Sequence, residues 1–151
     1  MTINYRNASL KDLEQLVRVE QSCFNPKKYH LSSKANFHHM LTKGNTEILI
    51  CQINKQICGM SVIFYRNTSS YGRLYSIAVL PEYQGKDIGK KLFQETVKSI
   101  KKRKLKGMLL EIRADNIKHK ERYLKLGFKE MKKLKNYYPD NTEAIKLKLE
   151  F

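Results

Sequence analysis

The stretch from Gly72 to Ile100 changes from a strand pattern to a helical pattern across one short turn, and this change constrains the fold more than any other feature. Residues 72–80 are largely apolar, and from residue 88 the apolar side chains recur at a helical period, at Ile88, Leu92, Phe93, Val97 and Ile100. A helix that follows a glycine-containing turn presents unpaired N–H groups at its first turn. The pattern therefore predicts an anion site where a strand of an α/β sheet leads into a helix.

The turn itself, PEYQGKDIGKK at residues 81–91, does not match the common nucleotide-binding motifs. A Walker A loop has four residues between its glycines and then Lys followed by Ser or Thr, whereas Gly85 and Gly89 enclose three residues and two lysines follow. Asp87 lies inside the turn, where its carboxylate is expected to compete with a phosphate for the N–H groups. The alternative is that its side chain points to solvent and only its N–H faces the ligand.

Periodicity predicts the remaining elements, and together they form an α/β sheet of mixed direction. Strands are predicted at residues 2–6, 47–53, 56–65, 72–80, 107–114, 128–133 and 143–150, with helices starting near residues 9, 33, 88 and 116. Ser9 and Asp12 resemble a capping box, Asn54-Lys55 a hairpin turn and Gly127 a helix C-cap. With 151 residues, 41% of them apolar, the chain is expected to be one domain spanning residues 1–151.

Net charge and hydropathy limit the classes of protein to which the chain is expected to belong. The chain carries 30 Lys and Arg against 14 Asp and Glu, a formal net charge of +16. Such a field attracts acidic partners, although a lysine-rich solvated surface explains the same count, because specific phosphate and base readout favours Arg. No run of about 18 apolar residues and no apolar N-terminal segment is present, so a cytoplasmic protein is expected.

The three cysteines, Cys23, Cys51 and Cys58, are too few and wrongly spaced for a zinc site or a disulfide framework, so no metal is expected. If Asn54-Lys55 forms a two-residue hairpin turn, Cys51 and Cys58 lie opposite each other and are close enough to bridge. In a reducing cytosol they are expected to stay free thiols.

Several motifs resemble one enzyme family. QGKDIG at residues 84–89 is similar to the Gln/Arg-x-x-Gly-x-Gly/Ala turn of the GNAT acetyltransferases, with Asp87 at the first glycine position. LLEIRADN at 109–116, ERYLKLGF at 121–128, and Asn-Tyr-Tyr-Pro at 136–139 followed by Glu-Ala resemble the bacterial and archaeal N-terminal acetyltransferases that modify ribosomal-protein alanine. The resemblance covers residues 75–149 by motif and the rest only by the order of elements. It implies a GNAT fold, with a mixed, mostly antiparallel sheet of about seven strands flanked by about four helices.

The resemblance also implies a cofactor, acetyl-CoA, and the residues that handle it. Glu111 is expected to act as general base through a water, unless it is only a salt-bridged acid, and Tyr123 to lie beside the CoA sulfur, unless it is only packed on a helix face. Asn116 is expected to bind the pantetheine arm, to cap the helix it precedes, or both. The remaining cofactor contacts are expected at Ile77, Ala78, Val79, Gln84, Gly85, Lys86, Asp87, Ile88, Gly89 and Lys90.

On the substrate side, the resemblance implies a peptide groove with Tyr29, Tyr137 and Tyr138 in its walls. The leading hypothesis is therefore an N-acetyltransferase that acetylates the α-amino group of a protein N-terminus, such as that of a ribosomal protein, by direct transfer in a ternary complex. A GNAT enzyme for a small amine or a lysine side chain is the alternative, and a nucleic-acid-binding module is the remote one, since no recognition signature accompanies the charge. A monomer or weak homodimer is expected, while N-terminal specificity and the need for an auxiliary subunit stay open.

Overall fold

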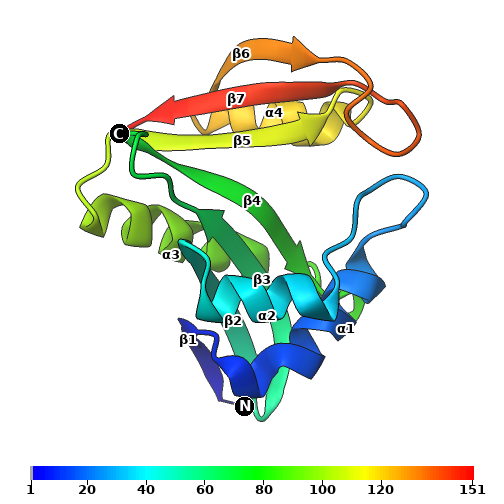
Figure 1. Cartoon of the computed structure of the whole chain (residues 1–151), viewed down its shortest axis with the longest axis vertical. Helices are drawn as coiled ribbons and strands as arrows, with labels where there is room; N and C mark the ends of the chain where they lie inside the picture. The colour runs from blue at the N-terminus through cyan, green and yellow to red at the C-terminus, as the bar shows by residue number, and fades with distance from the viewer. Residues whose placement is uncertain (1) are drawn as a thin grey trace.

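The computed structural model describes residues 2–151, and its elements follow the order predicted from the sequence (Figure 1). The strands are β1 (Ile3–Asn7), β2 (Thr46–Ile53), β3 (Gln56–Phe64), β4 (Tyr71–Val79), β5 (Gly107–Arg113), β6 (Lys129–Leu134) and β7 (Ala144–Glu150). The helices are α1 (Leu13–Cys23), α2 (Lys34–Thr42), α3 (Ile88–Lys102) and α4 (Ile117–Lys125). Short 3₁₀ turns at Leu10–Asp12 and Pro81–Tyr83, which periodicity did not predict, precede α1 and α3.

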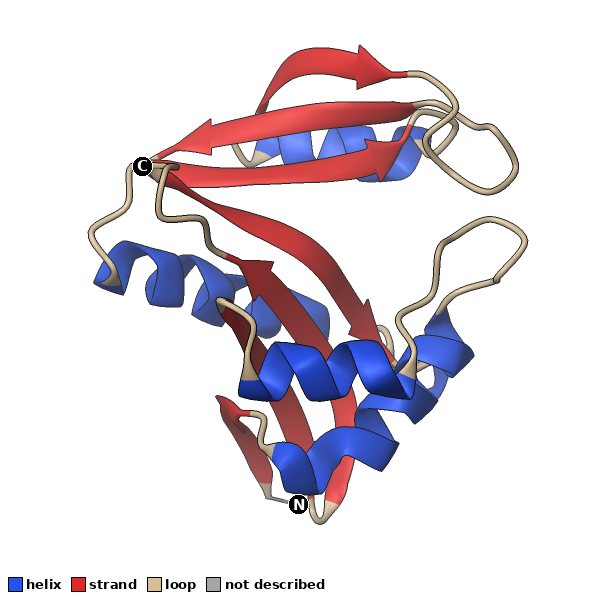
Figure 2. Ribbon diagram, in the orientation of Figure 1, coloured by secondary structure: helices blue, strands red, loops and turns tan. Residues whose placement is uncertain are grey.

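The strands form one seven-stranded sheet in the order β1-β2-β3-β4-β5-β7-β6. Every neighbouring pair is antiparallel except β4 and β5, so the predicted mixed, mostly antiparallel sheet is confirmed. The parallel pairing joins only Tyr71–Leu74 to Gly107–Leu110, and beyond it the two strands diverge, as Figure 2 shows. Residues 75–79 of β4 therefore present a free backbone edge toward β5.

Helices cover both faces of the sheet. On one face α3 places Leu92 and Ile100 in a cluster with Leu74, Met108 and Leu110 from β4 and β5. On the other face α1 and α2 place residues in a second cluster with β2 and β3, whose members include Leu16, Val19, Phe37, Ile50, Met60 and Val62. The amphipathic helical periods in the sequence arise from these two packed faces.

The hairpin between β2 and β3 corrects one prediction. Asn54 takes a left-handed φ of 57° in the turn, and Gln52 pairs with Ile57 as expected. The register then shifts at a β-bulge, so Cys51 pairs with Gly59 and Cys58 becomes the extra residue. The prediction that Cys51 and Cys58 lie directly opposite each other is therefore wrong, and both are buried free thiols.

None of the helices within residues 2–151 is both long enough and apolar enough to cross a membrane.

Candidate active site

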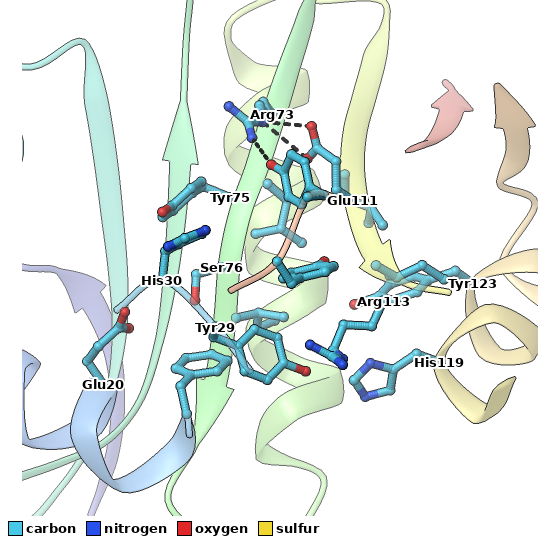
Figure 3. Close-up of a pocket in the computed structure, with 17 residues that line it drawn as sticks. Glu20, Tyr29, His30, Arg73, Tyr75, Ser76, Glu111, Arg113, His119 and Tyr123 are labelled. Atoms are coloured by element: carbon cyan, nitrogen blue, oxygen red, sulfur yellow. Dashed lines mark hydrogen bonds and ion pairs between the residues drawn. The ribbon is translucent and has the colours of Figure 1, made fainter. Parts of the chain in front are cut away.

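A cavity of about 370 Å³ opens between β4 and β5 where their pairing ends. Both strands line it, together with the loop after α1, helix α4 and the loop between β6 and β7 (Figure 3). These elements are far apart in the sequence, and the divergence of β4 and β5 brings them around one space. The predicted site residues that line it are Tyr29, Ile77, Glu111, Tyr123, Tyr137 and Tyr138.

Glu111 faces this cavity because its neighbours in β5, Leu110 and Ile112, point into the core. Its side chain is 10% exposed and its Oε1 lies 3.1 Å from Nε of Arg73. The same guanidinium donates from Nη2 to the hydroxyl of Tyr137 at 3.1 Å. Glu111 is thus a cavity-facing carboxylate and also a salt-bridged one, so both roles considered for it in the sequence describe part of its setting. The sequence analysis did not identify Arg73.

Tyr123 reaches the cavity from α4, where its ring packs edge-on against Phe128 at 5.4 Å between centroids. Burial raises the pKa of the Tyr123 hydroxyl, while the nearby Arg122 acts in the opposite direction. Complete transfer of its proton to a thiolate is therefore less favourable than between the unperturbed groups. This environment favours Tyr123 as a hydrogen-bond donor over Tyr123 as a full acid.

His119 also lines the cavity, one turn before Tyr123 on α4, and sequence reasoning did not identify it. Burial lowers the pKa of its imidazole, and the positive charge of Arg122 lowers it further. His119 is therefore neutral at pH 7, with one ring nitrogen able to accept a hydrogen bond.

Arg113 joins the two loops that hold the predicted substrate residues. Its side chain, 4% exposed, donates to the carbonyl of Lys28 at 2.7 Å, to Asp140 Oδ2 at 2.6 Å and to Thr142 Oγ1 at 2.9 Å. It also forms two 3.0 Å bonds with Asp115. Because one residue holds both loops, we call this set, Arg113 with Lys28, Asp115, Asp140 and Thr142, the Arg113 clamp.

The predicted aromatic wall is assembled around this clamp. The Arg113 guanidinium lies 5.4 Å from the ring centroid of Tyr29 and 4.9 Å from that of Tyr138. The two rings meet edge-to-face at 5.5 Å, and Tyr137 meets Tyr138 at 5.0 Å. The motif that contains Arg113 was visible in the sequence, but nothing local indicated that its side chain reaches two distant loops.

The turn before α3 has the geometry of an anion site. Gly85 has a φ of 78° and Asp87 a left-handed φ of 62°. Within residues 2–151 the N–H groups of residues 88–90 have no hydrogen-bond partner, and the first N–H to find one is that of Lys91, on the carbonyl of Asp87 at 3.0 Å. The Asp87 side chain is exposed and caps no N–H group. The Asp87 carboxylate therefore does not itself occupy these N–H groups, and its effect on the binding of a phosphate stays a prediction.

The other predicted cofactor contacts lie on β4, in the turn before α3, at the start of α3 and at the N-cap of α4. Gln84 donates from Nε2 to the carbonyl of Val79 at 3.0 Å, and Ala78 and Ile88 are buried in the core, with exposed fractions of 8% and 3%. Asn116 caps α4 by accepting from the N–H of His119 at 3.1 Å, which confirms its N-cap role, and it does not line the cavity.

A ligand with an extended arm and a phosphate group at one end fits these elements. The free edge of β4 offers backbone groups for the arm, as an added strand would, and the N–H groups at the start of α3 offer an anion site, with Lys86, Lys90 and Lys91 nearby. Within residues 2–151, no group of three or more His, Cys, Asp or Glu side chains is arranged to hold a metal ion.

Comparisons with known proteins show the family and the fold of the chain. The family model described as "Acetyltransferase (GNAT) domain" matches residues 13–151. An N-alpha-acetyltransferase of Sulfurisphaera tokodaii is 29% identical over 150 residues, covering 92% of this chain and 87% of that protein. A ribosomal protein bS18-alanine N-acetyltransferase of Haemophilus influenzae is 35% identical over 86 residues, 57% of each protein. The crystal structure of the ribosomal-protein-S18-alanine N-acetyltransferase of Escherichia coli matches with a TM-score of 0.86 at 23% identity, over 99% of this chain and 94% of that chain, which confirms the predicted GNAT fold.

Proposed function

The chain belongs to the GNAT family of acetyl-CoA-dependent N-acetyltransferases, and we propose that its acceptor is the α-amino group of a protein N-terminus. The observation that carries this proposal is the cavity between β4 and β5, closed by two loops whose aromatic rings Arg113 holds together. Such a cavity suits the first residue of an extended substrate peptide, because the opening of the cavity lets the residues that follow extend out of it. The names of the relatives from Sulfurisphaera and Haemophilus point to the same kind of acceptor, and a ribosomal protein is therefore the first substrate to test.

Acetyl-CoA supplies the activated acetyl group. Its arm is expected along the backbone of residues 77–79 and its phosphates at residues 84–90, with Tyr123 near the sulfur. The elements meet the chemical needs of this ligand, because no strand pairs with residues 75–79 of β4 on the side of β5 and the first N–H groups of α3 are free within residues 2–151; the Val79 carbonyl already accepts from Gln84 and Cys23.

Glu111 is proposed to take the proton of the attacking amine through a water. An α-amino group has a pKa near 8, so about a tenth is already neutral at pH 7 and the base has modest work to do. Arg73 orients the carboxylate at 3.1 Å and keeps it in the cavity. Tyr123, with its raised pKa, is proposed to donate a hydrogen bond to the departing thiolate.

Direct transfer in a ternary complex is proposed, because the cysteines are poor nucleophiles. The thiolate is the reactive form, and burial raises the pKa of the Cys23 thiol to about 11. That thiol instead donates to the carbonyl of Val79 at 3.4 Å. Cys51 and Cys58 are buried in the sheet, away from the cavity lining.

The test is an acetylation assay on a peptide library, read by mass spectrometry. The library contains peptides with free N-termini, the same peptides with blocked N-termini and internal lysines, and free polyamines. Acetylation of the free N-termini alone is expected. Modification confined to lysine side chains or free amines would contradict the proposal and favour the alternative GNAT activity.

A further inference from the structure

Ser76 has a buried hydroxyl that the described structure leaves unpaired. It is the one buried side-chain polar atom within residues 2–151 that finds no hydrogen-bond partner. The residue lies on the free edge of β4, just beyond Leu74, where the pairing with β5 ends, and it lines the cavity. Buried hydroxyls are nearly always hydrogen-bonded, because leaving one unpaired costs free energy. A ligand in the cavity would supply the missing partner.

The register of the sheet places Ser76 on the face covered by α1. Ser76 pairs with Val62 across β3 and β4, so the two side chains point to the same face. Val62 packs there with Leu16 and Val19 of α1. Glu20, the next residue of α1, lines the same cavity. In the view of Figure 3, Glu20 and Ser76 both lie on the side of the cavity away from Tyr123 and His119.

Glu20 is a largely buried acid, and one of its oxygens keeps some solvent contact and makes no hydrogen bond within residues 2–151. Only 4% of the residue is exposed, and its Oε2 accepts from the N–H of Ser32 at 2.7 Å. Oε1 has no partner, and no cation pairs with this carboxylate, within residues 2–151. Glu111 differs in this respect, because Arg73 neutralises it. Glu20 thus offers a hydrogen-bond acceptor at the α1 side of the cavity.

We propose that Ser76 and Glu20 form a subsite for a hydroxyl group on the first residue of the substrate, so that the enzyme prefers a protein N-terminus beginning with serine or threonine. This inference rests on the proposed function. A hydroxyl is the small group that satisfies both residues at once, since it accepts from Ser76 and donates to Glu20. An aliphatic first side chain of the same size leaves both unpaired.

The expected size of this preference is about tenfold in kcat/KM. A hydrogen bond to a charged group contributes more than a neutral one, but a trapped water partly replaces the hydroxyl in the competing complex. If a trapped water replaced the substrate hydroxyl fully, the enzyme would show no preference. The ratio of kcat/KM for two matched substrates therefore measures the contribution of the subsite directly.

The experiment compares two peptides that differ in one atom at the first residue. One begins with serine and the other with 2-aminobutyrate, in which a methyl group replaces the hydroxyl. Wild-type protein, Ser76→Ala and the control Ser70→Ala, an exposed serine just before β4, are assayed with acetyl-CoA. The serine peptide is expected to be preferred about tenfold by wild type and by Ser70→Ala, and the ratio is expected to be lower in Ser76→Ala, where only the bond to Glu20 is left.

Three outcomes decide the inference. Equal kcat/KM for the two peptides with wild-type protein would overturn it while leaving the proposed function intact. A preference that is undiminished in Ser76→Ala, in a variant with an unchanged melting temperature, would also overturn it. Acetylation of neither peptide, together with acetylation of lysine side chains, would remove the proposed function and the inference with it.

Discussion

Arg113 offers the sharpest test of how the two loops around the cavity are held together. The change is Arg113→Met, which keeps an unbranched side chain of similar length and removes the guanidinium. The clamp loses six hydrogen bonds, to Lys28, Asp115, Asp140 and Thr142. Nothing else within residues 2–151 joins the loop after α1 to the loop after β6 through charged groups.

The magnitude follows from the burial of the partners. Removing one member of a buried ion pair costs roughly 3–5 kcal/mol. The Arg113 side chain is 4% exposed, but the carboxylates of Asp115 and Asp140 are 55% and 33% exposed and regain water when it is lost. We therefore expect the lower end, about 3 kcal/mol of unfolding free energy, which for a chain of this length lowers the melting temperature by about 6–12 °C.

The pH dependence of the melting temperature provides a second measurement of the same clamp. Arg113 holds the pKa of Asp115 and that of Asp140 below their ordinary values. A lowered folded-state pKa stabilises the fold above the unfolded pKa, near 3.9, and that stability is lost as the pH falls through the folded-state pKa. The gap in melting temperature between wild type and Arg113→Met is therefore expected to be full at neutral pH and to narrow below about pH 4.

The assay combines thermal unfolding with steady-state acetylation. Loosened loops should raise the KM for the peptide by about tenfold or more and change the KM for acetyl-CoA little, since the clamp lies away from the turn before α3. Arg66→Met is the matched control, because the side chain of Arg66 is exposed and makes no hydrogen bond or ion pair within residues 2–151. A melting temperature within 2 °C of wild type and an unchanged peptide KM would refute the clamp.

Three further predictions test the chemistry and the backbone. Glu111→Gln and Tyr123→Phe should each lower kcat by roughly 100-fold, with the Glu111→Gln deficit shrinking as rising pH deprotonates the amine; wild-type turnover would remove these roles. Asp87→Gly should lower the KM for acetyl-CoA severalfold, because glycine adopts a φ of 62° without strain and removes a negative charge, and an unchanged KM would show that the acid is harmless. Gly107→Ala should lower the free energy of unfolding in denaturant by about 3 kcal/mol, because its Cβ would clash with the Leu149 carbonyl. Gly85→Ala meets open space and should lower it by about 1 kcal/mol, from its φ of 78° alone. Equal losses in the two variants would contradict this reasoning.

The local sequence pattern was sufficient to predict the helices and strands of the fold, because each pattern has a local physical cause. The apolar period of α3 is the period of the face it buries against β3 and β4, and Gly127 takes a φ of 103° at the end of α4. The hairpin at Asn54 was predicted for the same reason. The bulge beside Cys51 was not, because a register shift of one residue depends on how β3 meets both of its neighbours.

The site divides in the same way. Glu111 and Tyr123 stand in motifs that resemble a family, Tyr29 lies in a loop matched only by the order of elements, and the structure brings all three to one cavity. Arg73 lies in an ordinary strand and Arg113 in the same motif as Glu111, but only the folded chain reveals that each reaches across to a distant partner. A buried arginine has no local sequence signature, since the same residue type is common on solvated surfaces.

Asp87 shows why a departure from a motif needs the backbone to be interpreted. A glycine at this position is favoured by the left-handed conformation that the turn requires, and Asp is one of the few other residues that adopts it at modest cost. The observed φ of 62° meets that requirement, and the exposed side chain bonds none of the N–H groups that the motif serves. What remains of the substitution is one negative charge near an anion site, with Lys86, Lys90 and Lys91 around it. Because such a charge acts through solvent, its effect on acetyl-CoA binding should shrink as salt is added, while any effect of backbone strain should not. The salt dependence of the Asp87→Gly difference in KM therefore separates the two causes.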